Sequence, residues 1–267
     1  MNRTRCHAPL HTDANGNRLI RRQSPRSLIQ NADPNALLIA CRENSEEDSV
    51  RDAHIKYGQR LARQERWDLL GAETQRADER QKLTPGLMPV AELLAFGARA
   101  DVVNAVEHAL FDGHPAKDAP LLDGIIALEH VHAEFPKSHI IASIVAQAHM
   151  DCAWAWRGNF WDDDMPSRNR EAFEAHFDRA ADILSAYSVS ETGSALLAST
   201  ICGILGGTHR DGYRVADRYE ALIDLNPANP RPMRAMGNHL LPRWHGSYEE
   251  LELEARRTAS RTTEVWG

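Results

Sequence analysis

Apolar side chains recur at intervals of three and four residues along most of the chain. The clearest stripe consists of Phe173, Phe177, Ala180, Ala181, Leu184 and Tyr187, and the acidic residues Glu174, Asp178 and Asp182 lie off it. This spacing places the apolar side chains on one face of an α-helix. Strands would need alternating apolar and polar residues, and no segment follows that pattern convincingly. The sequence therefore predicts an all-α protein.

Glycine and proline divide this pattern into separate helices. The first is expected to begin at Asp33 and Pro34, because Asp is a good N-cap and Pro is favoured at the first helical position. The predicted helices are 34–43, 48–63, 66–81, 89–97, 100–111, 120–134, 138–157, 168–187, 193–205, 209–225, 230–241 and 246–263. Short connections without strands leave a closed bundle or a stack of helix hairpins.

Residues 1–32 differ from the rest of the chain. They carry Arg3, Arg5, Arg18, Arg21, Arg22 and Arg26 against a single acid, Asp13, and show no helical period. We interpret them as a basic, loosely draped arm. A nucleic-acid-binding arm is the alternative, but the aromatic residues that such arms interleave with basic ones are missing. The helical domain is expected to span residues 33–267.

Composition narrows the class of protein further. The chain is 42% hydrophobic and 26% charged, which is ordinary for a globular protein. A net charge of −7 gives no global indication of nucleic acid or an anionic membrane as a partner. No stretch reaches the roughly 20 apolar residues of a membrane span. Thirteen histidines and four widely spaced cysteines without a Cys-x-x-Cys pair fit a reducing cytoplasm.

Several segments match parts of a common pattern. Tyr219 to Pro227 ends a helix with an aromatic residue, a buried pair and Asn-Pro. Met233-x-x-Met236-Gly237-x-x-Leu240 follows, and then Gly246-x-Tyr248-x-x-Leu251. Near the other end, Gly58-x-x-Leu61 precedes Trp67-x-x-Leu70. Together these segments resemble tetratricopeptide repeats, 34-residue helix hairpins that stack into a solenoid.

The resemblance implies an irregular α-solenoid of antiparallel hairpins. It pairs helices 138–157 with 168–187, 193–205 with 209–225, and 230–241 with 246–263. Phe177, Tyr219 and Ala255 take corresponding positions on the second helices. Helices 193–205 and 230–241 are expected side by side, and Gly237 is expected at a close helix crossing.

The segment LLPRWHGSYEELELEARRTA resembles a second family, bacterial tetratricopeptide-like proteins of unassigned function, and that likeness implies no activity. The chain reaches Trp266 and Gly267 directly after a helix, without an obvious polar capping helix. This leaves room for the native protein to continue beyond residue 267.

In tetratricopeptide units, defined first-helix positions face the groove. The resemblance thus places Arg231, Arg234 and Asn238 on the inner surface, together with Ser143 and Gln147 one row earlier. Arginine offers a forked, permanently charged donor set for a carboxylate. The expected function is non-enzymatic binding of a protein or peptide through an acidic or C-terminal carboxylate group. Solvated surface arginines are the simpler interpretation of Arg231 and Arg234.

Two alternatives remain open. One is an enzyme of unrecognised class, whose groups would come from His149, Asp151 and His176. The other is a structural domain of a longer polypeptide. No nucleophile, phosphate-loop or metal signature is present in the sequence. His149 and Cys152 have a legitimate ligand spacing, but Cys152 also continues an apolar stripe. We therefore expect no metal and no cofactor.

Overall fold

The computed structural model describes residues 45–119, 121–160, 164–207, 214–244 and 246–266. Its elements are α-helices: α2 (Glu46–Arg63), α3 (Trp67–Glu79), α4 (Val90–Ala109), α5 (Asp123–Glu134), α6 (His139–Arg157), α7 (Ser167–Leu184), α8 (Val189–Thr192), α9 (Ala195–Ile204), α10 (Val215–Leu225), α11 (Arg231–His239), α12 (Tyr248–Arg261) and α13 (Thr263–Trp266). Within the described ranges, the one β-type pairing is an isolated bridge between Leu83 and Pro89. The predicted all-α class is confirmed.

Most predicted helices are present, with one clear error and two omissions. The predicted helices 89–97 and 100–111 form the single helix α4, because Gly97 lies inside the helix and does not end it. The short helices α8 and α13 were not predicted. The predicted helix 34–43 and the basic arm lie outside the described residues.

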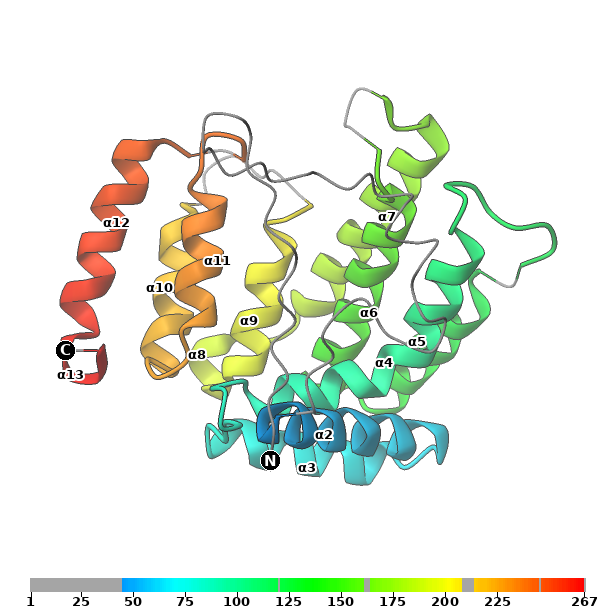
Figure 1. Cartoon of the computed structure of the whole chain (residues 1–267). Coiled ribbons are helices and arrows are strands. Elements are labelled where there is room, and N and C mark those ends of the chain that lie inside the picture. Colours follow the sequence, from blue (N-terminus) through cyan, green and yellow to red (C-terminus); the bar gives the residue numbers. More distant parts are fainter. Residues whose placement is uncertain (1–44, 120, 161–163, 208–213, 245, 267) are drawn as a thin grey trace, which may run out of the picture. The chain divides into compact units, whose positions relative to one another are not determined.

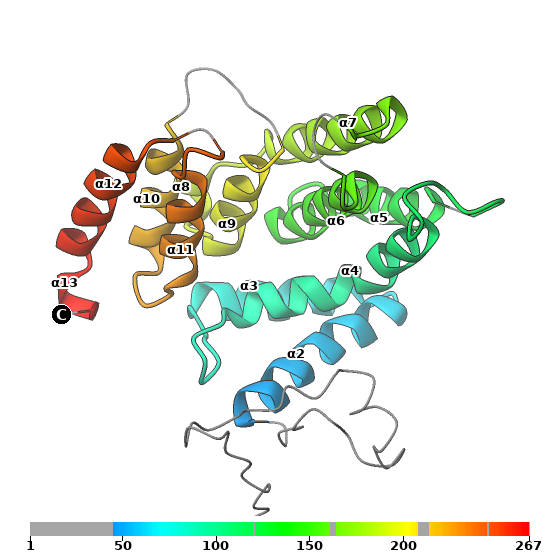
Figure 2. The same ribbon diagram turned by 45° about the horizontal axis from the view of Figure 1, so that its top comes forward.

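The helices run in two main directions. Figure 1 shows α6, α7, α9, α10, α11 and α12 roughly upright, with α2 and α3 crossing beneath them. Figure 2 shows the same crossing after a turn of the view, with α4 running along α2 and reaching α6. All the described residues belong to one compact unit.

Two glycines allow α2 and α4 to cross closely. A Cβ atom built on Gly58 would overlap the carbonyl oxygen of Leu94, and one built on Gly97 would overlap that of Ile55. Each glycine thus faces the backbone of the other helix. Side chains at either position would push the helices apart, so this crossing depends on both residues.

Helix α6 is the centre of the larger hydrophobic core. It packs against α3, α4, α5, α7 and α9. Nearly every side chain from Ile140 to Ala153 is buried, including polar Ser143 and His149. A helix that is apolar around most of its circumference must be enclosed by others.

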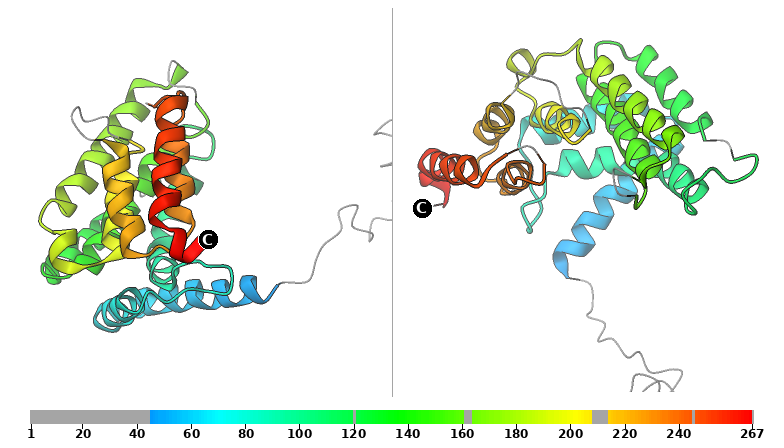
Figure 3. Two further views of the ribbon diagram at one scale, coloured as in Figure 1. Left: turned by 90° about the vertical axis from the view of Figure 1, so that its left-hand side faces the viewer. Right: turned by 90° about the horizontal axis from the view of Figure 1, so that it is seen from above.

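Antiparallel helix pairs are present, whereas a regular solenoid is not shown. Helix α9 packs on both α6 and α7, and α10 packs on both α9 and α11. Ala198 and Cys202 of α9 share a second hydrophobic cluster with Met236 and Leu240 of α11. However, α9 and α11 lack the extended backbone contact that joins α6 to α9. Side chains therefore join α9 to α11, and their backbones approach less closely than those of α6 and α9. Figure 3 shows α9 to α12 end-on from above.

The prediction of a close crossing at Gly237 is wrong. An added Cβ atom there would lie 3.6 Å from Leu251 Cδ1, an ordinary contact distance. Gly58, which carries the same motif position, does lie at a close crossing.

These two glycines predict opposite effects of one substitution. Gly58→Ala should lower the unfolding free energy by roughly 2 kcal/mol, because the new methyl group overlaps the α4 backbone. Gly237→Ala should raise it by up to about 1 kcal/mol, since alanine favours helix more than glycine does. Urea unfolding of both variants is the measurement. Equal effects of the two substitutions would contradict the crossing.

Tyr219 and Leu222 are buried as predicted, at 4% and 3% exposure. The Tyr219 hydroxyl also lies 2.9 Å from His239 Nδ1 on α11. Tyr219→Ala should therefore lower the unfolding free energy by roughly 3–5 kcal/mol. Tyr248, with 69% exposure, is the matched control, and Tyr248→Ala should change stability by less than about 0.5 kcal/mol. Similar melting of both variants and wild type would refute this assignment of the core.

Candidate functional site

The predicted groove residues of α6 do not face solvent. Ser143 is completely buried, and its Oγ donates to the carbonyl oxygen of His139 at 2.7 Å. Gln147 is half-buried, and its Nε2 donates to Thr200 Oγ1 of α9 at 2.9 Å. The placement of Ser143 in a groove is therefore wrong: α6 is enclosed by neighbouring helices. Gln147 joins α6 to α9.

Arg231 points toward α4 instead of a groove. Its Nη1 lies 2.9 Å from Glu92 Oε2, and Ser199 of α9 donates to the other oxygen of Glu92 at 3.0 Å. Glu92 thus connects the first turn of α4 with α9 and α11. Arg231 is therefore engaged in an ion pair within the protein, which neither the ligand clamp nor the solvated-surface interpretation predicted.

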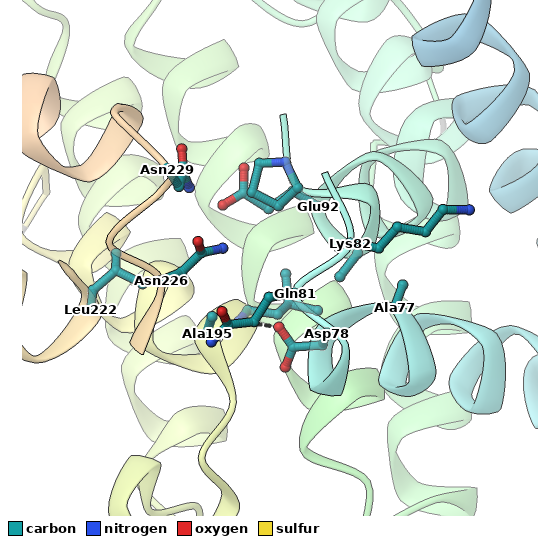
Figure 4. A pocket seen from close by; sticks show the side chains of 12 residues that line it. Ala77, Asp78, Gln81, Lys82, Glu92, Ala195, Leu222, Asn226 and Asn229 are labelled. Atoms are coloured by element: carbon teal, nitrogen blue, oxygen red, sulfur yellow. Dashed lines mark hydrogen bonds between the residues drawn. The ribbon is translucent and has the colours of Figure 1, made fainter. Parts of the chain in front are cut away.

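Glu92 lines a small pocket where α3, α4, α9 and the α10–α11 connection meet (Figure 4). Asp78 organises it: its two oxygens accept from Ser194 Oγ at 2.6 Å and from the Leu196 backbone N–H at 2.9 Å. Asp78 thereby caps the N-terminus of α9 from another helix. Burial raises the pKa of the Asp78 carboxyl.

The pocket is too small for an organic ligand. Its volume of about 10 Å³ is close to the space of one water molecule. Its walls are tied to each other; Gln81 on one side donates to the carbonyl oxygen of Leu225. We interpret this junction as a packing contact that sets the position of α9.

Arg234 and Asn238 remain on the exposed side of α11. Arg234 Nε makes a long contact of 3.4 Å with the carbonyl oxygen of Pro230, and no described carboxylate pairs with it. Asn238 Oδ1 accepts from Arg243. The structure therefore does not gather Arg231, Arg234 and Asn238 around one point.

An open apolar groove runs between α11 and α12. Its volume is about 310 Å³, and nearly all of its wall is apolar. The lining residues, which define the α11–α12 groove, are Met233, Met236, Gly237, Leu240, Leu251, Ala255, Thr258, Ala259 and Thr262. Ala255 and Ala259 are exposed along it. Small side chains on α12 and a glycine on α11 leave this space open.

The sequence contained a signal for this groove that we interpreted differently. The repeat pattern places Gly237 at a close helix crossing and Ala255 at a packed position of the second helix. Small residues permit close packing but do not enforce it, and α11 and α12 are in limited contact. The small residues that predicted close packing of α11 against α12 therefore line the open α11–α12 groove.

The histidines of the enzyme alternative do come together. His149 Nδ1 of α6 lies 2.9 Å from His176 Nδ1 of α7, and His149 Nε2 lies 2.9 Å from Glu129 Oε1 of α5. Arg179 donates to both Glu129 oxygens, at 2.7 Å and 2.5 Å. These four residues form the histidine cluster. The third candidate, Asp151, lies elsewhere and pairs with Arg99 at 2.6 Å.

Charge and burial shift the pKa values in this cluster. Arg179 hydrogen bonds lower the pKa of Glu129 to about 2, so Glu129 is ionised. Burial lowers the pKa of His149, and it lowers that of His176 to about 4. Both imidazoles are therefore neutral at neutral pH. The cluster can hold and transfer protons between its side chains.

The remaining candidate features are the metal ligands, the cysteines and a membrane-spanning helix. In the described ranges, no three His, Cys, Asp or Glu side chains converge to hold a metal ion. Burial raises the pKa of Cys152 and of Cys202 to about 12, so both thiols are protonated. None of the described helices is long and apolar enough to cross a membrane.

Comparisons with known proteins return no relative. No protein-family model matches the chain, and no curated protein or solved structure matches it. The tetratricopeptide resemblance therefore stays a prediction, and the function has to be argued from the site itself.

Proposed function

We propose that this protein binds an amphipathic α-helix of a partner protein in the α11–α12 groove. The observation that carries the proposal is the groove itself, an apolar channel of about 310 Å³ along two helices. That volume is about twice that of a cavity of ~150 Å³ that holds a benzene ring. It can take several aliphatic side chains from a helix lying along the seam.

The packing inside the molecule supports a helix as the occupant. The pair α6–α7 receives α9, which contacts both of its helices. The pair α9–α10 receives α11, which packs on α10 and shares a hydrophobic cluster with α9. The pair α11–α12 presents the corresponding seam, and it is open in the part of the chain that the structure describes. A helix bound there would repeat a contact that the fold already uses.

The side chains of the groove favour an adaptable apolar contact. Met233 and Met236 are flexible and polarisable, and methionine-lined surfaces accommodate varied helices. Ala255 and Ala259 allow the partner's backbone to approach closely. The partner helix should therefore carry large aliphatic residues at intervals of three and four.

Arg234 supplies the charge preference. It lies one turn before Gly237, a residue that lines the groove. Helix α11 contains Arg231, Arg234 and His239 but no acidic residue. A carboxylate on the flank of the partner helix would therefore find a donor without a competing acid on α11.

The test is selection from a displayed library of helical peptides with variable apolar stripes and flanks. Enriched peptides should have the i, i+3, i+4, i+7 pattern and should shift the NMR methyl signals of Met233 and Met236. Ala255→Glu should weaken their binding by at least about tenfold, because the new carboxylate would be buried against the peptide without a partner.

Ala235→Glu provides the matched control. Ala235 is exposed on the side of α11 away from the groove, so the same substitution should leave binding unchanged. Enrichment of no helical peptide, or equal binding by both variants, would refute the proposal. A dimer of the free protein that Ala255→Glu dissociates would also refute it, because a second copy would then occupy the groove.

Arg234→Ala tests the charge preference separately. It should weaken binding of an acid-flanked peptide by about 1.5–3 kcal/mol, the scale of a charged hydrogen bond. Arg231→Ala should have little effect on binding, since Arg231 is engaged with Glu92. Calorimetry with matched peptides carrying Glu or Gln is the measurement. An unchanged affinity of the Arg234 variant, or an equal loss for both peptides, would exclude the carboxylate contact.

A further inference from the structure

Helix α12, which forms one wall of the α11–α12 groove, has a polar inner face. Its buried residues are Glu254 and Thr258, and Thr262 is buried directly after its last turn. These three lie four residues apart, so they form one stripe along the helix. Among the described residues of α12, Leu251 is the apolar side chain that packs against the second hydrophobic cluster. Helix α12 therefore buries little apolar surface against the rest of the protein.

The backbone of α12 is also in limited contact with its neighbours. The helix lies at the edge of the helical unit, beyond α10 and α11 (Figure 3). It approaches α11 and the short helix α13 over short stretches. No described helix makes with α12 the extended backbone contact that joins α6 to α7. Few contacts of this kind are typical of a segment that opens locally, without unfolding of the core.

Ion pairs hold α12 on α10. Glu254 Oε1 accepts from Nη2 of Arg214, the N-cap residue of α10, at 2.8 Å. Arg261 Nη1 lies 2.6 Å from Glu220 Oε2, and the same guanidinium pairs with Asp224. The Arg261 pairs are partly exposed and contribute little to stability. The contact between Arg214 and Glu254 is different, because the Glu254 side chain is only 1% exposed.

The buried carboxylate makes the docked position of α12 marginal. Glu254 Oε2 is buried and has no hydrogen-bond partner among the described residues. Arg257 also donates to Glu254 Oε1, at 2.8 Å, but it belongs to α12 and moves with it. Undocking of α12 would hydrate both carboxylate oxygens, whereas the docked state depends on the charge of Arg214. Arg214 therefore controls the balance between the two states.

We propose that α12 is a detachable wall of the groove: it undocks from α10 and α11 as a unit in the free protein, and a partner helix in the groove keeps it docked. Undocking removes Leu251, Ala255 and Ala259 from the groove, so a partner helix finds this apolar wall only in the docked state. Binding therefore shifts the population toward that state. The second part rests on the proposed function, whereas the first part concerns the free protein alone.

Hydrogen exchange of the intact free chain, corrected for intrinsic exchange rates, tests the undocking. An isolated helix as short as α12 is marginal in water, so undocking exposes its amides to exchange. The hydrogen-bonded amides of α12 should share one common protection factor, at least about tenfold lower than that of α6 amides. Arg214→Met removes the charge and keeps a long side chain. It should lower α12 protection by a further tenfold or so, while α6 protection stays unchanged.

Arg256→Met is the matched control. Arg256 is an exposed arginine of α12 that pairs with Glu252 of the same helix at 2.5 Å, so its loss should leave α12 protection unchanged. If Arg214→Met does not fold, Arg214→Gln replaces it with the same expectation. Protection of α12 equal to that of α6, protection that declines gradually toward the end of α12, or an unchanged Arg214 variant would each overturn the undocking.

A helical peptide selected for the groove measures the coupling. At about 100 times its dissociation constant, the peptide should raise α12 protection by about a hundredfold, or up to the protection of α6. A peptide that binds in the groove without changing α12 protection would overturn the coupling. Failure of every peptide to bind would instead refute the proposed function and the coupling with it, and exchange in the free protein would still decide whether α12 detaches.

Discussion

The enclosure of α6 is the constraint on which the other packing contacts depend. From Ile140 to Ala153 nearly all of its side chains are buried, so five other helices have to surround it. Each of them contributes an apolar stripe to one continuous core, and only the exposed outer faces are free to vary in polarity. Polar groups on α6 must then find partners inside the protein. Ser143, Gln147 and His149 do so by bonding to the helix itself, to α9 and to the histidine cluster.

Polar contacts set the positions of the outer helices around that core. Asp78 caps α9 from α3, and Glu92 connects α4 with α9 and α11. Glu129 connects α5 with α7. These contacts contribute little apolar area, but buried polar groups tolerate few alternative partners. The polar contacts therefore select one arrangement of the helices, whereas the apolar stripes alone would be compatible with several arrangements.

Small residues have different structural roles at the α2–α4 crossing and between α11 and α12. At the α2–α4 crossing, glycines face backbone carbonyl groups, and no ligand could enter. Between α11 and α12, glycine and alanine face one another across open space. The first arrangement stabilises the fold, and the second provides the apolar surface on which the proposed binding of a partner helix rests. The histidine cluster lies on α5, α6 and α7, outside the set of residues that line this groove.

The sequence by itself determined the helical class, most helix positions and the buried face of those helices with a clear apolar stripe. Periodicity is a local property, and Phe177, Tyr219 and Leu222 are buried because their own helices place them on an apolar stripe. It also singled out His149 and His176, although not Glu129, which lacks any motif. The tertiary structure decided which helix covers which stripe. Gly58 and Gly237 share a motif position, yet one faces a backbone and the other an open groove, because neighbours distant in sequence set the spacing. The prediction that Ser143 and Arg231 belong to a binding surface failed for a related reason, since it could not take account of neighbours distant in sequence. Their helix faces were predicted, but the burial of one and the Glu92 partner of the other depend on helices far away along the chain.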